Sequence, residues 1–271
     1  HNWSSTSLAA GPVYKQAGIS ALSYSATHPS VTADNEWYFR TIFNDAIQGS
    51  YLAQYAVDTL AQSRVTIIHE SLPYGAFLAE VFDENAVKLG AVVDNNIQLD
   101  MQGDIPAQVA QIANSIKQRG EQAGLLFVST HDAEAILLVQ ALKDLGVKNL
   151  IMGPDTVYSQ AFFQGFNHLP KEQANPGFYS NGIYMTAPIN FDAANQMAQI
   201  FQQAYFKKYD EKPDWAAAYG YDTVKVIVAA IRAANIDSQH TMTLQRQQLR
   251  DQLASMTSLD SAIKGVTGLT Y

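Results

Sequence analysis

Short apolar runs that end in polar residues recur along this chain of 271 residues. In residues 65–71 a β-branched run leads into His69, Glu70 and Ser71, and such a run predicts a strand buried on both faces. A helix is expected next, because its apolar positions form one broad face: Phe77, Leu78, Val81, Phe82 and Val87. The same pattern returns at residues 125–129 and 150–153. Three such strands indicate an α/β fold with a parallel sheet, whose ligands bind outside the carboxyl ends of the strands.

The rest of the chain alternates weaker strand patterns with helical ones. The predicted strands are residues 19–24, 37–42, 92–99 and 178–186, with the beginning of another at 264–271. The predicted helices are residues 46–60, 105–116, 133–145, 215–234 and 244–256, together with one that Asp192 caps and that ends at Lys208. A first helix ends at Gly18, with Ser4, Ser5 and Thr6 as candidate N-caps. Residues 162–177 are rich in Gly and Pro and are expected to form loops.

Composition narrows the class of protein. The apolar fraction of 47% and the charged fraction of 15% are those of a globular protein, and the length suits two modest α/β domains. A net charge of −8 argues against nucleic acid as a partner, because binding phosphates requires a basic face. No apolar run approaches the ~18 residues of a membrane span. The absence of cysteine excludes disulfides, thiolate nucleophiles and cysteine-based metal sites.

The sequence carries no motif that demands catalysis or a cofactor. G-x-S-x-G, G-x-x-x-x-G-K-[ST] and G-x-G-x-x-G are all absent, and the six histidines lack metal-ligand spacing. His69 and His131 follow predicted strands, where a hydrogen-bonded rim residue is more common than a catalytic base. Asp155, after Gly153-Pro154, can be a general base, a ligand counter-charge or a helix cap. Because no nucleophile accompanies it, the last two interpretations are better supported, and we predict that the protein is not an enzyme.

Five segments together resemble a known family: HNWSSTSLAAGPVYKQAGI, SYSATHP, IIHESLPYGAF, IMGPDTV and AAYGYDTVKVIVAAI. They are similar to the type I periplasmic binding proteins, and most of all to the leucine/isoleucine/valine-binding receptors of ABC transporters. The similarity covers essentially the whole chain. It implies two flavodoxin-like lobes that close on a ligand in the cleft between them. Lobe 1 would comprise residues 1–45 and 189–262, and lobe 2 residues 46–188 and 263–271.

The resemblance also implies which residues of lobe 1 bind the ligand. The amide and hydroxyl of Ser4 would hold an α-carboxylate. In the turn Ser25-Ala26-Thr27, Thr27 would bond the carboxylate or the ammonium, and the Ser25 carbonyl would accept from the ammonium. This agrees with elementary physics, because a zwitterion taken from water needs donors for its carboxylate and acceptors for its ammonium.

Lobe 2 would supply Asp155 as the partner of the ammonium, Tyr74 as a cover over the ligand, and His131. Two of these positions depart from the family pattern. Receptors for aliphatic ligands carry an aromatic residue at the position of His131, and Asp155 replaces a longer Glu. The departures predict a more polar pocket than a leucine site, for a polar, acidic or amide-bearing ligand.

The implied function is an extracytoplasmic receptor, in the periplasm or its equivalent, that captures an amino acid for a membrane permease. One alternative is the sensor domain of a membrane signalling protein. The other, less favoured, is an α/β enzyme that uses His131 and Asp155 as acid and base. Family members begin with a strand, a helix and a further strand before the position of His1, and they continue past Tyr271. We therefore expect lobe 1 to lack its leading strands in this sequence and the natural gene product to carry them.

Overall fold

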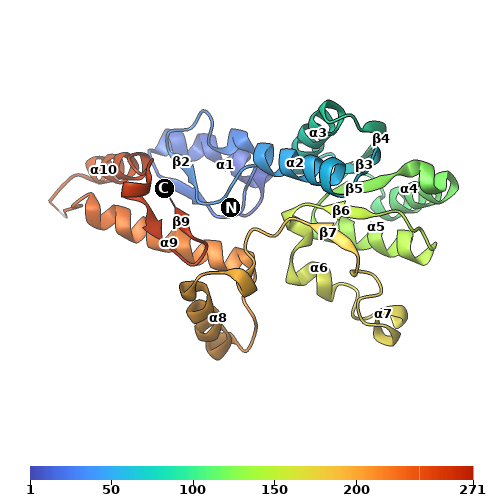
Figure 1. Cartoon of the computed structure of the whole chain (residues 1–271). Coiled ribbons are helices and arrows are strands. Elements are labelled where there is room, and N and C mark those ends of the chain that lie inside the picture. The colour runs from blue at the N-terminus through green and yellow to red at the C-terminus, as the bar shows by residue number, and fades with distance from the viewer. Residues whose placement is uncertain (238, 271) are drawn as a thin grey trace. The chain divides into compact units, whose positions relative to one another are not determined.

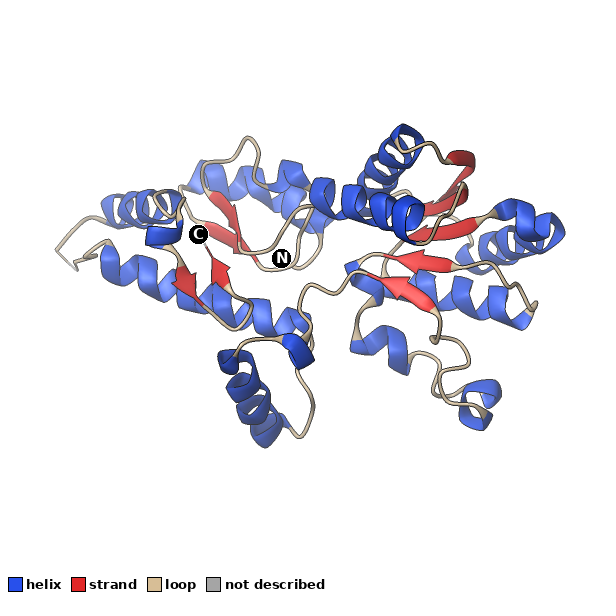
Figure 2. Cartoon of the chain, viewed as in Figure 1, coloured by secondary structure: helices blue, strands red, loops and turns tan. Residues whose placement is uncertain are grey.

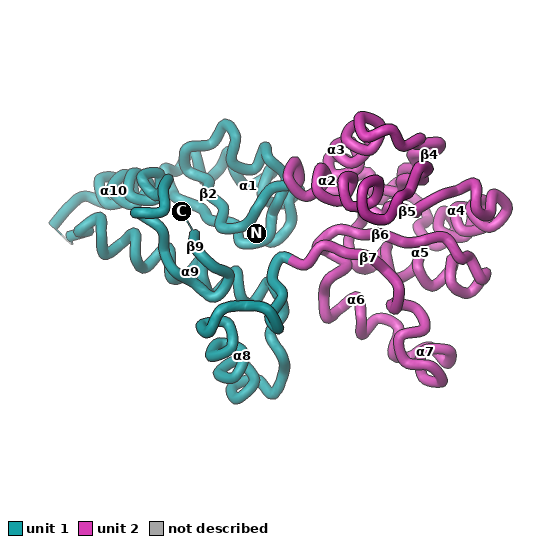
Figure 3. Tube along the Cα trace, viewed as in Figure 1, with its two compact units in different colours: residues 1–44, 188–271 teal, residues 45–187 magenta. Residues whose placement is uncertain are grey.

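The structure is a computed structural model that describes residues 1–237 and 239–270 (Figure 1). The chain divides into two compact units, which are coloured separately in Figure 3. Unit 1 combines two segments, His1–Asn44 and Pro188–Tyr271, whereas unit 2 is the single segment Asp45–Ala187. The chain therefore leaves unit 1 and returns to it.

Unit 2 is built on five parallel strands in the order β4-β3-β5-β6-β7. The strands are β3 (Arg64–Glu70), β4 (Val92–Leu99), β5 (Leu125–Ser129), β6 (Ile151–Gly153) and β7 (Ile183–Met185). All four strand pairs are parallel. The predicted α/β class and parallel sheet are thus confirmed, and Figure 2 shows the strands of unit 2 alternating with helices.

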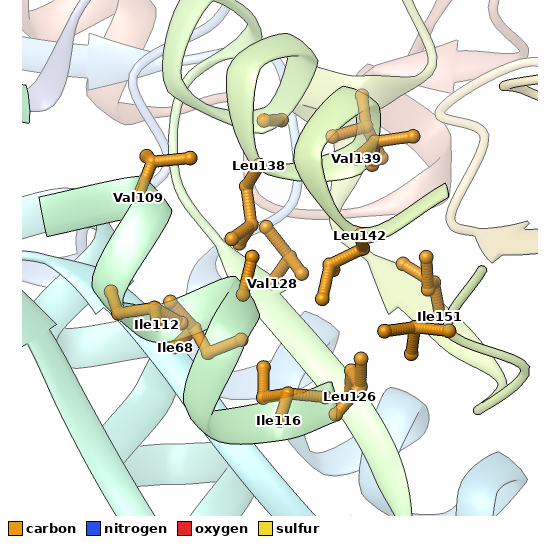
Figure 4. Packing of buried hydrophobic residues seen from close by; sticks show 14 of the residues in the cluster. Ile68, Val109, Ile112, Ile116, Leu126, Val128, Leu138, Val139, Leu142 and Ile151 are labelled. Carbon is orange, nitrogen blue, oxygen red and sulfur yellow. The ribbon is translucent and has the colours of Figure 1, made fainter. Parts of the chain in front are cut away.

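Helices pack on both faces of this sheet. They are α2 (Asp45–Gln54), α3 (Pro73–Lys88), α4 (Ile105–Arg119) and α5 (Asp132–Asp144), followed by the short α6 (Gln160–Gln164) and α7 (Pro170–Ala174). In β5, Leu125 and Phe127 join the core beneath α2 and α3, while Leu126 and Val128 join the core beneath α4 and α5, shown in Figure 4. This alternation is the period of two that a strand imposes on its side chains. It explains why every residue of β5 is buried.

Two predictions for unit 2 need adjustment. The helix expected over residues 46–60 is α-helical only to Gln54, and Tyr55–Thr59 form a π-helical turn. Residues 162–177 are not loop throughout, because parts of α6 and all of α7 lie there. Short helices of this kind carry too few turns to show a periodic pattern in the sequence.

Unit 1 contains longer helices and short strands. The helices are α1 (Ser4–Ala17), α8 (Gln196–Tyr209), α9 (Trp215–Ala233) and α10 (Met242–Ala254). Strands β1 (Ala21–Ser23) and β2 (Tyr38–Arg40) are parallel, whereas β8 (Ile263–Lys264) and β9 (Leu269–Thr270) are antiparallel. Helix α9 buries Trp215, Ala218, Val226 and other residues, but its apolar side chains Tyr221, Val224, Val228 and Ile231 are exposed. Helix α9 is therefore buried on one face and exposed on the other.

The helix caps of unit 1 differ in part from prediction. Gly18 is the left-handed C-cap of α1 as expected, but the N-cap is Trp3, and Ser4 is already the first helical residue. Asp192 does not cap α8: the side chain of Asn195 does, by accepting from the amide of Ala198 at 3.1 Å. Asp214 caps α9 through the amide of Ala217. The sequence pattern locates the start of a helix only to within a few residues, so it cannot decide which of several neighbouring residues is the cap.

The assignment of residues 263–271 to the second lobe is wrong for the described residues 263–270, which belong to unit 1. The buried carboxylate of Asp222, in α9, accepts from the amides of Val266 at 2.9 Å and Thr267 at 2.7 Å. It also accepts from the Thr267 hydroxyl at 2.7 Å. These bonds hold the turn between β8 and β9 against α9. Such a contact between residues far apart in the sequence cannot be predicted from a local pattern. No helix in the described part of the chain is both long and apolar enough to cross a membrane.

Candidate ligand-binding site

Polar residues gather at the carboxyl edge of the sheet in unit 2. Strand β3 ends at Glu70 and leads to Tyr74 in the first turn of α3. Strand β5 ends at Ser129 and leads to His131, and β6 ends at Gly153 and leads to Asp155. Because parallel strands share one carboxyl edge, their following loops lie at the same side of the sheet. The structure thus brings together the three predicted site residues of this unit.

Asp155 and Tyr74 are joined by a hydrogen bond. The Tyr74 hydroxyl donates to Oδ1 of Asp155 at 2.7 Å, and both side chains are buried. Burial raises the pKa of Asp155, although the bonds from Tyr74 and Gln48 oppose the shift. Burial also raises the pKa of Tyr74 well above its ordinary value, reinforced by the charges of Asp155 and Asp45. The pair is therefore a buried carboxyl group held by a neutral phenol.

Gln48 and Asp45, which the sequence analysis did not single out, support Asp155 from α2. The Gln48 side-chain oxygen accepts from the Asp155 amide at 2.9 Å and from the Thr186 hydroxyl at 2.5 Å. Its Nε2 donates to Oδ1 of Asp45 at 3.1 Å. The spacing of Asp45 and Gln48 by three residues puts both on one helix face, which is otherwise buried through Gly49 and Leu52. In the sequence, the signal that could have identified Asp45 and Gln48 is that both are polar residues on the face of the helix that also carries Gly49 and Leu52.

Glu70 is a second buried carboxylate that the sequence analysis did not assign. Its Oε2 accepts from the His131 backbone amide at 3.0 Å and from the His131 ring Nδ1 at 2.7 Å. Burial lowers the pKa of His131, but the hydrogen bond and charge of Glu70, with the charges of Glu134 and Asp132, outweigh it and raise that pKa overall. The His131 ring lies 5.1 Å from the Tyr74 ring between centroids. His131 is thus a hydrogen-bonded residue at the strand edge, as one interpretation of the sequence proposed.

Gly75 explains how these groups pack so closely. A side-chain carbon at Gly75 would lie 2.4 Å from both the Glu70 side chain and the Ser129 carbonyl oxygen, closer than atoms tolerate. The Ser129 hydroxyl donates to the Gly75 carbonyl at 3.0 Å. Thr156 donates to the Thr130 carbonyl at 2.7 Å. The loops after β3, β5 and β6 are therefore bonded to one another.

Unit 1 holds the other predicted site residues. The buried Ser4 hydroxyl accepts from the His28 amide at 3.2 Å, which joins the first turn of α1 to the loop after β1. In that loop the Ser25 hydroxyl donates to the Asn2 carbonyl at 2.6 Å, and the Ala26 amide donates to Ser23 Oγ at 2.8 Å. Ser4 and Ser25 thus link the start of the chain to the loop after β1, the loop in which Ala26 and Thr27 also lie. The Ser25 hydroxyl is used in this link.

Thr27 is 1% exposed, and its hydroxyl has no hydrogen-bond partner among the described residues. A buried hydroxyl without a partner costs free energy, so its presence favours a role in binding. The backbone around it is held by Arg40, whose guanidinium donates to the carbonyls of Thr27 at 2.8 Å, His28 at 3.0 Å and Pro29 at 3.0 Å. Arg40 is a positioning residue that the sequence analysis did not find.

No group of three or more His, Asp or Glu side chains that could hold a metal ion occurs within residues 1–237 and 239–270. Within unit 2, the carboxyl edge of the sheet presents a buried carboxyl group at Asp155, and within unit 1 the loop after β1 presents the Thr27 hydroxyl. Ligands of parallel α/β sheets bind outside the carboxyl ends of the strands, so the polar edge of unit 2 is that of a ligand-binding α/β protein.

The chain belongs to the periplasmic binding protein family, whose model matches residues 1–269. Among curated relatives, it is 25% identical over 237 residues to "Leu/Ile/Val-binding protein homolog 1" of Brucella abortus, covering 86% of this chain and 59% of that protein. It is 26% identical over 212 residues to the "Leu/Ile/Val-binding protein" of Citrobacter freundii, covering 78% and 53%. The chain thus spans less than two thirds of the length of these relatives.

Solved structures show the same fold. The branched-chain amino acid transporter substrate binding protein LivJ of Streptococcus pneumoniae, in complex with isoleucine, matches with a TM-score of 0.82 at 23% identity. The match covers 100% of this chain and 70% of that one. A solute binding protein of an ABC transporter from R. palustris, in complex with benzoate, matches with a TM-score of 0.78 at 16% identity, covering 98% and 67%. The predicted type I periplasmic-binding-protein fold is confirmed.

Proposed function

We propose that the chain is the ligand-binding part of an extracytoplasmic receptor that captures a small amino acid, or a related polar zwitterion, for uptake through an ABC-transporter permease. The family membership supports a solute-binding role. The relatives named as Leu/Ile/Val-binding proteins support an amino acid as the ligand class. These relatives are binding proteins, and we propose that this chain likewise binds its ligand without turning it over.

The observation that carries the proposal is the carboxylate of Asp155. It is 1% exposed, and no Lys or Arg among the described residues forms an ion pair with it. A buried charge without an ion-pair partner is costly, and the charge of His131 offsets only part of that cost, because burial still raises the pKa of Asp155. We therefore propose that a cationic group of the ligand completes the site. The ammonium of an amino acid would supply that group, and the bond would belong to the stronger, charge-assisted class.

The other residues take complementary roles in the proposal. Thr27 would donate its unpartnered hydroxyl to the ligand's α-carboxylate, and the amides in the first turn of α1, at Ser4, would favour that anion. The Ser25 carbonyl, next to Ala26 in the same turn, would accept a hydrogen bond from the ligand's ammonium. Tyr74 would cover the ligand while orienting Asp155. His131 would contact the ligand's side chain.

A thermal-shift screen of the chain against the amino acids and small amides tests this function. A ligand at 100 times its dissociation constant stabilises the folded state by about 2.7 kcal/mol. Asp155→Asn should abolish the response, because it removes the charge that pairs with the ammonium. Asp58→Asn, at an exposed carboxylate of the same unit, should respond like the unmodified chain. A full response from Asp155→Asn would refute the counter-charge assignment, and recovery of the ligand chemically unchanged would agree with binding without turnover.

A further inference from the structure

The turn that precedes β7 contains the one Asn-Gly pair in the sequence, Asn181-Gly182. Both residues are exposed, and they lead directly into β7, an edge strand of the sheet in unit 2 (Figure 1). In such a pair the backbone nitrogen of the glycine can attack the side-chain amide of the asparagine, because glycine has no side chain to obstruct the approach. Whether the two groups are available to react depends on the conformation of this turn.

The two reacting groups have no competing hydrogen bonds. Within residues 1–237 and 239–270, neither the Asn181 side chain nor the Gly182 amide makes one. Gly182 has a φ of +80°, and a side-chain carbon placed there would meet no atom within 4 Å. The start of the turn is held by Glu172, whose carboxylate accepts from the amides of Gly177 and Tyr179. The exposed Asn181 side chain lies against Gly177, and a rotamer change, which takes nanoseconds or less, brings its carbonyl carbon toward the Gly182 nitrogen.

Lys143, in α5, contacts the peptide group that would react. Its ammonium donates to the Asn181 carbonyl oxygen at 3.3 Å. That carbonyl and the Gly182 nitrogen belong to the same peptide bond, so a cation at the oxygen draws electron density from the nitrogen and makes its proton easier to remove. The deprotonated peptide group is the nucleophile, and the ammonium already lies where its negative charge develops. Lys143 therefore promotes the attack of the Gly182 nitrogen.

The charges around the turn are predominantly positive. Lys143 forms no ion pair among the described residues, and burial, followed by the charge of Lys148, lowers its pKa. Lys143 and Lys148 line one cavity of about 290 Å³ at this turn. Lys171 is paired with Asp144 at 2.7 Å, so these two charges compensate each other. A carboxylate formed in place of the Asn181 amide would therefore arise close to two ammonium groups that lack an acidic partner, which favours the product.

We propose that Asn181 is a modification site, at which the chain converts its own asparagine into aspartate and isoaspartate with Lys143 as the promoting residue. Hydroxide removes the Gly182 amide proton, and the nitrogen attacks the side-chain carbonyl carbon of Asn181. The new carbon–nitrogen bond closes a five-membered imide, and the side-chain nitrogen leaves as ammonia. Water then opens the imide at either carbonyl, so that one amide and one water give one carboxylate and one ammonium ion. Opening at the backbone carbonyl gives isoaspartate, which lengthens the main chain by one carbon just before β7.

The test is peptide mapping by mass spectrometry of the 271-residue chain after incubation at about pH 6.5 and about pH 8.5. Each product is one dalton heavier than the asparagine peptide, and chromatography separates isoaspartate from aspartate. Asn181 should convert faster than Asn175 and Asn190, which lie on the same tryptic peptide but precede Pro176 and Phe191. Its conversion should be faster at the higher pH, because hydroxide removes the proton from the attacking nitrogen.

Two substitutions of Lys143 separate its promoting role from a structural one. Lys143→Met removes the cation and should slow the conversion about tenfold, the change in rate that corresponds to one hydrogen bond to a charged group. Lys143→Arg keeps a cationic donor and should restore most of the rate. Lys148→Met is the matched control, because it removes a lysine from the same cavity without removing the bond to Asn181, and it should change the rate far less.

The outcomes distinguish the site from its promotion. Asn181 that stays intact at about pH 8.5, or that converts no faster than Asn190, would overturn the whole proposal. Equal rates in Lys143→Met and the unmodified chain would overturn the role of Lys143 and leave the modification site standing. If circular dichroism shows that Lys143→Met unfolds, a synthetic peptide of residues 178–186 decides instead, because it contains the pair without Lys143. Conversion that is slower in the peptide than in the folded chain supports promotion, and conversion that is as fast or faster contradicts it.

Discussion

Asp155, which we propose as a ligand-binding residue, shows how such a residue can reduce the stability of the protein that carries it. Because burial raises its pKa above the usual 3.8, the folded chain holds this proton more tightly than the unfolded chain does. Its contribution to stability is therefore greatest below the unfolded pKa and is lost as pH rises through the folded pKa. Above its folded pKa the residue is a charge that unit 2 accommodates at a cost. The ligand's ammonium would remove that cost.

We therefore predict that the unliganded Asp155→Asn variant gains stability, relative to the unmodified chain, as pH rises from about 4 to about 7. The measurement is the free energy of unfolding in urea at several pH values. Asp58→Asn should show no such trend, because its carboxylate is exposed. A difference between Asp155→Asn and the unmodified chain that stays constant with pH would contradict the raised pKa.

Tyr74 contributes through its hydroxyl as well as its ring. Tyr74→Phe keeps the packing of the ring but removes the donor at 2.7 Å from Asp155. Hydrogen bonds to charged groups contribute about 1.5–3 kcal/mol, so we expect a loss of that order in the free energy of unfolding. Tyr51→Phe, at an exposed tyrosine of the same unit, should change it by no more than about 0.5 kcal/mol. Equal effects of the two substitutions would show that the Asp155 contact is not stabilising.

At the scale of elements, Arg40 holds the loop after β1 in place. Besides the three carbonyls from Thr27 to Pro29, its guanidinium donates to the Thr32 hydroxyl at 2.8 Å. Arg40→Lys keeps the charge but cannot reproduce this planar set of donors. We expect a loss of about 1.5–3 kcal/mol in stability and weaker ligand binding. Arg232→Lys, an exposed arginine of α9, is the matched control, and equal stability of the two variants would refute the loop-holding role.

Some residues of the candidate site could be predicted from the sequence, and others could not, for physical reasons. Asp155 and His131 could be found because each follows a buried strand, and strand ends are visible as apolar runs that stop, whereas Tyr74 was assigned through the family resemblance. Glu70 also ends such a run, but its role depends on a contact with a residue 61 positions away, which no local pattern encodes. The same holds for Gln48, whose partner Asp155 is 107 positions away. Residues 263–270 were misplaced because two-residue strands carry no periodicity.

At the scale of the whole molecule, the two units differ in how they are built. Unit 2 is one continuous segment with a five-stranded parallel sheet and a hydrophobic core on each face. Unit 1 joins two distant segments, its described strands form two-stranded sheets, and the clusters around Ala26 and around Val226 each contain three buried residues. Burial of apolar surface is the main source of stability, so unit 2 should be the more stable of the two.

We predict that the chain unfolds in two steps and that residues 45–187, expressed alone, fold cooperatively. Hydrogen exchange should be slowest in β3 and β5, which are central strands with nearly complete burial, and faster in α1, α9 and the strands of unit 1. In urea, the isolated segment should unfold at the same midpoint concentration as the second step of the full chain. A single transition at which the circular dichroism and exchange of both units change together would show instead that unit 1 is needed for unit 2 to fold. The Asp155–Tyr74 and Glu70–His131 contacts lie wholly within residues 45–187, so the nitrogen-15 NMR signals of the His131 ring should be the same in this segment as in the full chain.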